Sequence, residues 1–314
     1  MKVSNLLYAV TMGKWAMMPQ YLIEYKAVVE KLLSRGYSAE EYAKPFSETN
    51  PIKFSIAGSA SKIAASSQNS STNPYDDCPD DSIGIFCISG AMLKYGTMCS
   101  YGTMEIADAM REAIDSGKLS GMIIDTDSGG GSVDAIPPVV DVIKYAQSKG
   151  IPVVACVDLC ASAAYYFACQ CDEIIAGNSI SSEIGSIGVM MSFRTNKKQL
   201  ADAGIEDHTV YSNLSDWKNL PYMNAINGAP DETTRYNLLK TEELDPLAKG
   251  FQDAVMACRP KLDQSVDGIL SGRMFFAAQA VENGLIDAVG GMDMAIQRCK
   301  DIRSNSIINK YLNQ

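Results

Sequence analysis

Short apolar segments alternate with amphipathic segments through most of the chain after residue 81. The apolar segments SIGIFCI, GMIIDTD and PVVACV occupy residues 82–88, 121–127 and 152–157. The segments between them, at 104–114 and 133–147, place apolar residues at helical spacing. Buried strands separated by amphipathic helices indicate a sheet that is covered by helices. The pattern predicts an α/β fold.

The same alternation predicts further elements downstream. We expect a helix at 161–169, strands at 173–176, 186–191 and 208–211, and a long polar helix from about residue 231 to 256. A helix–strand–helix unit at 277–299 closes the core.

Two regions precede this core. Residues 1–54 form a predicted N-terminal helical accessory region, in which the segment 21–36 has helical spacing and ends at Gly36. Residues 55–81 are rich in Ser, Ala and Asn and predict a flexible linker. The expected division is therefore 1–54, the linker 55–81, a catalytic domain at 82–304 and a C-terminal tail at 305–314.

Composition narrows the classes of function. The net charge of -10, without a basic run, argues against nucleic-acid binding. Lys14 interrupts the N-terminal apolar residues, so we expect no signal peptide, and no apolar run reaches the ~18 residues that a membrane span needs. Nine cysteines without disulfide-type spacing indicate reduced thiols and a cytoplasmic protein.

Four of these cysteines, at positions 156, 160, 169 and 171, lie close together in the sequence. They fall across a predicted buried strand and the helix after it, which disfavours a zinc site. We expect no metal and no cofactor.

A glycine-rich turn, Asp127 to Ser132, follows the strand at 121–127. Its free backbone N–H groups could form an oxyanion hole, although a strand–helix connection that merely tolerates glycine explains the turn equally well. A phosphate-binding loop is disfavoured, because the GxxxxGK[ST] and GxGxxG spacings are absent.

Ser162 follows the apolar strand at 152–157 and opens the next predicted helix. The partial positive charge at a helix start favours a nucleophilic alkoxide and an oxyanion there. The alternative is an ordinary N-cap serine.

A nucleophilic serine needs a base, and His208 is the single histidine of the chain. A Ser-His-Asp triad through His208 is a weak candidate. Lys218 is the other candidate, because a desolvated amine can accept the serine proton. Trp217, Leu220 and Pro221 could shield the Lys218 amine from water. The alternative interpretation is that Lys218 is an ordinary surface lysine.

In order along the chain, IDTDSGGGSV, ASAAYYFAC, GSIGVM and GRMFFAAQAVENGLIDAVGG resemble motifs of the signal peptide peptidase A (SppA) family, which includes phage head-maturation proteases. The resemblance covers about residues 82–299 and implies a Clp protease/crotonase-like fold of ββα units. It also implies a Ser–Lys dyad of Ser162 and Lys218, with an oxyanion hole formed by Gly130, Gly131 and Ala163.

The resemblance further implies a homo-oligomeric ring that hydrolyses peptide bonds of peptide or protein substrates, with the dyad able to form between protomers. Gly129, where the family often has proline, and Ala163-Ala164, where many cellular members have two glycines, depart from the usual pattern. The alanines and the N-terminal WAMMP favour a phage head protease acting on capsid or scaffold proteins, in the host cytoplasm or the prohead.

Three alternatives stay open at this point. The first is a cellular SppA-like peptidase that degrades signal peptides or other peptides. The second is a crotonase-type acyl-CoA enzyme, which the Ser162 context and Lys218 disfavour. The third is a catalytically silent scaffold or capsid-assembly protein.

Overall fold

The computed structural model describes residues 15–17, 52–56, 62–65, 75, 78–97, 100–193, 195–206, 208–228 and 231–312. Within these residues, nine strands form one sheet in the order β10-β9-β7-β5-β4-β2-β3, and β8 pairs with both β7 and β11. The strands are β2 (Ile52–Ile56), β3 (Lys62–Ala65), β4 (Ser82–Ser89), β5 (Leu119–Ser128), β7 (Val153–Ala161), β8 (Glu173–Ala176), β9 (Glu183–Gly185), β10 (Met274–Phe276) and β11 (Ala288–Val289).

The centre of the sheet is parallel and buried on both faces. β4, β5, β7 and β8 run parallel to one another. Successive residues of these strands alternate between two apolar cores, so that Met122 and Ile124 enter one core while Ile123 enters the other. Such strands need apolar residues at nearly every position, which is why they are continuous apolar runs in the sequence.

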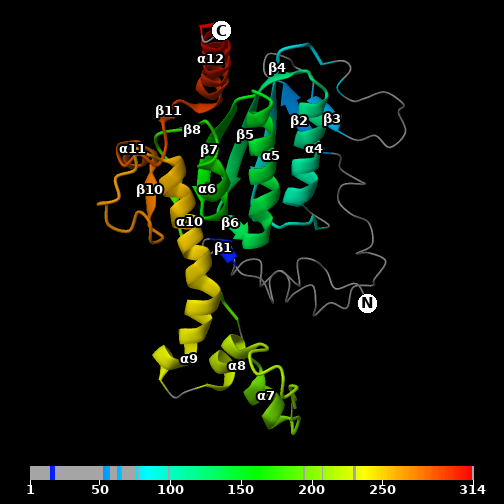
Figure 1. The fold of residues 1–314 in the computed structure, drawn as a ribbon, viewed down its shortest axis with the longest axis vertical. Coiled ribbons are helices and arrows are strands. Elements are labelled where there is room, and N and C mark those ends of the chain that lie inside the picture. Colours follow the sequence, from blue (N-terminus) through cyan, green and yellow to red (C-terminus); the bar gives the residue numbers. More distant parts are fainter. Residues whose placement is uncertain are drawn as a thin grey trace.

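Helices cover both faces (Figure 1). The larger core contains residues of α4 (Thr103–Asp115), α5 (Ile136–Ser148), which follows the 3₁₀ turn η1 (Val133–Ala135), and α6 (Ala163–Ala168). α12 (Gly291–Leu312) packs on the other face through Ala295 and Cys299. A Cβ at Gly121 would lie 2.3 Å from the Cys299 sulfur, so glycine in β5 permits this close approach. α11 (Ala277–Glu282) lies between β10 and β11 in the chain.

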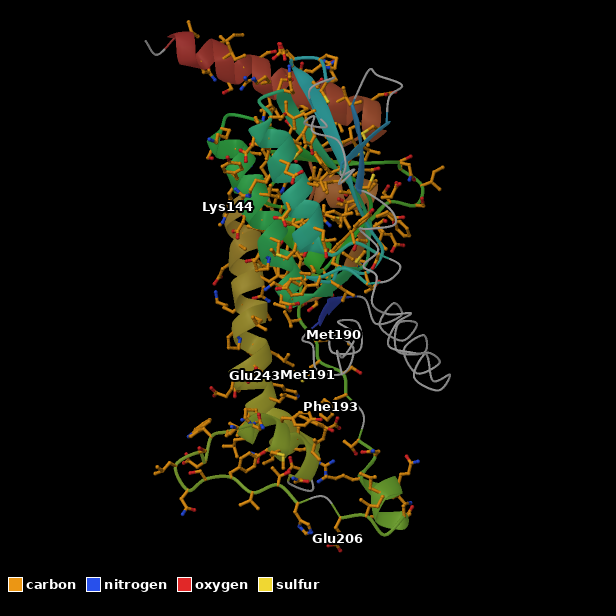
Figure 2. All side chains as sticks on the ribbon, turned by 90° about the vertical axis from the view of Figure 1, so that its right-hand side faces the viewer. Lys144, Met190, Met191, Phe193, Glu206 and Glu243 are labelled. Atoms are coloured by element: carbon orange, nitrogen blue, oxygen red, sulfur yellow. The ribbon has the colours of Figure 1, made fainter. Side chains whose placement is uncertain are left out.

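An arm, which we define as the described residues between 195 and 244, extends away from the body (Figure 1). It contains α7 (Lys197–Asp202), α8 (Leu220–Asn227), α9 (Glu232–Leu238) and the π-helical segment η2 (Leu239–Leu244), and α10 (Asp245–Cys258) returns from it to the body. Met190, Met191 and Phe193 lie on the segment that leads into the arm (Figure 2). The Phe193 ring packs against Tyr222 of α8, with 5.3 Å between centroids.

The structure confirms the predicted α/β class and most elements between 82 and 299. Two predicted strands are wrong. The strand near the GSIGVM motif ends at Gly185, because the next residue, Ser186, has a positive φ of 55°, which extended strands do not adopt. Residues 208–211 form no strand in the described part of the chain; Val210 is 92% exposed and has no face to pack on.

Outside the core, three findings differ from the expected organisation. β2 and β3 lie at residues assigned to the accessory region and the linker, and β2 extends the sheet by pairing with β4. Residues 15–17 form strand β1 (Trp15–Met17) rather than helix. α12 continues through 305–312, where we expected a tail. The predicted helix at 21–36 lies outside the described residues, and the domain boundaries stay predictions.

None of the helices in the described ranges combines the length and the apolar character that crossing a membrane requires.

Candidate active site

The candidate site lies beyond the carboxyl ends of the parallel strands. β5 ends at Ser128 and leads into the glycine turn and β6 (Gly130–Ser132), while β7 ends at Ala161, directly before Ser162. α6 packs against β6, which brings the two candidate segments together. Ligands of open α/β sheets bind at this edge.

Ser162 has a strained backbone at the turn from β7 into α6. Its φ is 56° and its ψ is -118°, a conformation that residues with a side chain seldom adopt. Two backbone hydrogen bonds hold it there: its N–H donates to the Gly185 carbonyl at 2.9 Å, and its carbonyl accepts from the Tyr166 N–H at 2.9 Å. Strain of this kind concentrates at functional sites, and a sharp strand-to-helix turn is how nucleophilic serines of α/β hydrolases are presented.

The Ser162 side chain is not an N-cap. It makes no capping hydrogen bond to α6. Its Oγ instead donates to the carbonyl oxygen of Gly188 at 3.3 Å, and the residue is only 1% exposed. The structure therefore removes the N-cap alternative that the sequence left open.

Hydrogen bonds and close contacts hold the glycine turn on both sides. Gly130 has a φ of 97°, and a Cβ at Gly131 would lie 2.0 Å from the Met92 carbonyl oxygen, so both positions require glycine. Met92 donates to the Gly130 carbonyl at 3.0 Å and accepts from the Ser132 N–H at 2.9 Å. The Ser128 hydroxyl donates to the Gly90 carbonyl at 2.6 Å. These contacts restrain a turn that lacks the usual proline at 129.

The three predicted oxyanion donors differ in their availability. The Gly130 N–H already donates to Ser128 Oγ at 3.2 Å. Ala163 is the first residue of α6, so its N–H has no partner within that helix. Gly131 lies opposite Ala16 in the ladder of β1 with β6. Of the three, Ala163 is thus the donor at an open helix start.

A single chain does not bring Lys218 to Ser162. Lys218 precedes α8, which lies in the arm, whereas α6 lies in the body (Figure 1). Lys218 is exposed, and its N–H donates to the Ser215 carbonyl at 3.1 Å within a turn of the arm. Trp217, which we expected to shield the amine, is itself 61% exposed. The shielding is therefore not present within one chain.

His208 also belongs to the arm. Its imidazole is 79% exposed and lies 3.5 Å from the carboxylate of Glu206. Glu206 is at the outer end of the arm (Figure 2). A triad through His208 would thus also need a second chain.

An apolar cavity of about 330 Å³ lies near the serine, although Ser162 does not line it. Tyr166 lies one turn after Ser162, and Val189 follows the Gly188 that accepts the serine hydrogen bond. Apart from Asp141, the lining is apolar or glycine: Val133, Ile136, Pro137, Val140, Asp141, Tyr166, Val189, Pro246, Leu247, Gly250 and Phe251. The cavity can hold an apolar side chain of a bound peptide. Sequence reasoning missed it, because its walls come from segments more than 100 residues apart.

The four clustered cysteines are buried but do not share one environment. Cys156 packs in the core beneath α12, whereas Cys160, Cys169 and Cys171 pack in the core on the other face of the sheet. Burial raises the pKa of Cys156 to about 12. In the part of the chain that the structure describes, no three His, Cys, Asp or Glu side chains come together as a metal site.

A strained serine beside a glycine turn, at a helix start whose first N–H has no partner within the helix, has the parts of a serine-nucleophile acyl-transfer site on an α/β fold. The chain belongs to peptidase family S49, whose family model matches residues 145–305, just over half of the chain. That range includes Ser162, Ala163 and Lys218; the glycine turn precedes it.

Three curated relatives show the range of the family. The chain is 30% identical over 248 residues to Serine protease SPPA, chloroplastic, of Arabidopsis thaliana, covering 73% of this chain and 33% of the relative. It is 24% identical over 222 residues to Protease 4 of Salmonella typhi, covering 70% and 34%. It is 33% identical over 124 residues to the Head-tail preconnector protein GP5 of Enterobacteria phage P21, covering 39% and 24%. The chain thus spans about a third of the length of the first two relatives.

Two solved structures match about two thirds of the chain at low identity. The 1510-N membrane-bound stomatin-specific protease matches with a TM-score of 0.40 and 15% identity, over 68% of this chain and 82% of that one. An enoyl-CoA hydratase from Shewanella pealeana matches with a TM-score of 0.37 and 9% identity, over 71% and 69%. Both TM-scores lie below 0.5, so neither structure locates a functional residue of this chain.

Proposed function

We propose that the chain is a serine endopeptidase that forms an acyl-enzyme on Ser162, with Lys218 as the general base. The observation that carries this proposal is the strained backbone of Ser162, held at the strand–helix turn in a chain of peptidase family S49. The Gly131 and Ala163 N–H groups hold the oxyanion.

The chemistry needs neither a metal nor a cofactor. Neutral Lys218 takes the Ser162 proton while Oγ attacks the scissile carbonyl carbon. The carbonyl oxygen becomes an oxyanion that the backbone N–H groups stabilise. Lys218 then gives the proton to the leaving amine as the C–N bond breaks. A water activated by Lys218 attacks the resulting ester, which releases the acid and regenerates the serine.

Lys218 of one protomer acts on Ser162 of its neighbour in this proposal. The arm carries Lys218 away from the body, and the exposed amine is surrounded by water in a single chain. Docking of the arm onto a neighbouring body desolvates the amine, which disfavours its charged form. A head-to-tail arrangement of this kind closes into a ring.

The substrate is an extended peptide with an apolar side chain. Backbone pairing along β6 holds the peptide chain, and the apolar cavity near Ser162 takes one side chain. For the biological role we propose maturation of a phage head, since the chain is similar to a phage head–tail preconnector protein. The site acts on capsid or scaffold proteins in that role.

The dyad is tested by substitution and complementation. Ser162→Ala and Lys218→Arg should each abolish cleavage of a fluorogenic peptide with Leu before the scissile bond, because a guanidinium cannot act as the base. Lys198→Arg, at another exposed lysine of the arm, is the matched control. An equal mixture of Ser162→Ala and Lys218→Ala chains should recover about a quarter of the wild-type sites, since only mixed neighbours form an intact pair. No recovery would show that the pair does not form between chains.

The biological role is tested with natural substrates. Capsid and scaffold proteins from the same genome, co-expressed with the wild-type chain, should show new termini by mass spectrometry that are absent with Ser162→Ala. If the wild-type assembly cleaves neither these proteins nor the fluorogenic peptide, the chain is a scaffold that retains the fold.

A further inference from the structure

A segment from the start of the chain lies on the edge of the strand that begins at the candidate oxyanion turn. β1 pairs antiparallel with β6, with Trp15 opposite Ser132, Ala16 opposite Gly131 and Met17 opposite Gly130. Figure 1 shows β1 beside β6 at the lower end of the body. More than 100 residues of sequence separate these partners.

Met92 bridges to one edge of β6, and β1 occupies the other edge. Gly131 bridges Met92 on one side, and its other side faces Ala16. A strand has two edges for backbone pairing, so the described residues leave none for an added peptide. A substrate that pairs with β6 must take the place of β1.

The direction of β1 is also that of a peptide entering the site. The chain runs from Trp15, opposite Ser132, to Met17, opposite Gly130. It therefore advances toward the start of β6 at the glycine turn, beside which the proposed mechanism places the scissile carbonyl of a substrate. β1 therefore runs in the direction expected for the part of an extended substrate that precedes the scissile bond.

We propose that residues 15–17 occupy the substrate-binding edge of β6 and compete there with peptide substrates. This inference rests on the proposed peptidase function, because it concerns the same site. The ladder has three residue pairs, and each backbone hydrogen bond has a modest net strength, so a substrate peptide can displace it.

Substitutions in β1 test the competition by steady-state kinetics. Ala16→Pro with Met17→Pro removes both backbone N–H groups, so one of the ladder donors must be lost. The KM for the fluorogenic peptide should fall several-fold while kcat changes little. Ala16→Ser with Met17→Leu keeps both N–H groups and should retain the wild-type KM. A KM that is equal in all three proteins would overturn the inference and leave the peptidase intact.

A peptide added in trans gives a second test. An acetylated peptide with the sequence of residues 14–19, KWAMMP, should inhibit the proline variant competitively. The same peptide N-methylated at the residues that match Ala16 and Met17 should not inhibit, because it cannot donate to the edge. Inhibition by neither peptide, or equally by both, contradicts backbone pairing at this edge.

Hydrogen exchange separates this inference from the peptidase proposal. In full-length Ser162→Ala, amides 15–17 should be protected, and saturating fluorogenic peptide should accelerate their exchange. If the peptide binds by calorimetry while their exchange stays unchanged, the competition is wrong. If Ser162→Ala still cleaves, the nucleophile assignment is wrong, and the exchange result still decides the competition.

Discussion

The hydroxyl of Tyr165 donates a 2.7 Å hydrogen bond to the carbonyl oxygen of Leu285, 120 residues further along the chain. Both residues are fully buried. Burial raises the pKa of Tyr165 well above its ordinary value, so the phenol keeps the proton that it donates. The bond fixes the helix that follows Ser162 to the C-terminal unit.

Tyr165→Phe should destabilise the protein without changing the shape of the core. It leaves the Leu285 carbonyl without this partner, which costs about 1–3 kcal/mol in the free energy of unfolding. Urea unfolding followed by circular dichroism measures the loss. Tyr145→Phe, at a tyrosine that bonds Asp115 near the surface, should cost much less. Equal losses in the two variants would show that the buried bond has no special role.

Gly131→Ala should lower kcat strongly. The added methyl group would lie 2.0 Å from the Met92 carbonyl oxygen, and backbone atoms cannot yield that distance without moving the turn. Displacing one oxyanion donor costs about 10²–10³ in rate. Single-turnover kinetics with the fluorogenic peptide measure the effect, and an unfolding curve shows whether the fold survives. A folded variant with wild-type kcat would exclude this turn from the oxyanion hole.

Gly250→Phe should fill the apolar cavity and raise the KM for peptides with a large apolar side chain. Gly250 lines the cavity from α10, and nothing lies within 4 Å of a Cβ built there. Replacing a helical glycine also favours the helix, so stability should not fall. Ala257→Phe, at an exposed position of α10 away from the cavity, is the control. An unchanged KM would show that the cavity takes no substrate side chain.

Cys258 should be alkylated faster than the more exposed Cys87 at neutral pH. A hydrogen bond from Cys169 lowers the pKa of Cys258 to about 6, and the positive charges of Lys144 and Arg259 add to this against the opposing effect of partial burial. Burial, followed by the charge of Asp125, raises the pKa of Cys87 to about 11.

Because the thiolate is the reactive form, iodoacetamide should modify Cys258 readily above pH of about 6, and the rate should fall below that value. Peptide mass spectrometry after short exposure over a pH series measures both sites. Faster labelling of Cys87 at neutral pH would contradict the low pKa of Cys258.

The sequence predicted the body of the fold well because its strands are buried on both faces. β4, β5 and β7 are short apolar runs, which are typical of strands that lie between two helical layers. β2 was missed because it is a short strand of five residues beside a Ser-rich segment. The strand expected at 186–191 does not form because Ser186 has a positive φ, which the pattern of hydrophobic residues does not encode.

The site was predictable in part. Ser162 and the glycine turn each follow a predicted buried strand, and the motifs around them occur in the order typical of the family. These two signals selected both sites, and the structure places them side by side. The backbone strain of Ser162 and the cavity arise from tertiary contacts, so no local pattern reveals them. The role of Lys218 stays a prediction, because the arm that carries it projects away from its own serine.

The projecting arm also has a consequence for how the proposed activity scales. When two halves of a reactive pair belong to different molecules, the number of complete sites follows the law of mass action, and specific activity rises with protein concentration. Dilution should therefore lower the specific activity reversibly, without unfolding the protein. Under the proposed pairing between chains, the local concentration of the protein would thus help to set when proteolysis begins.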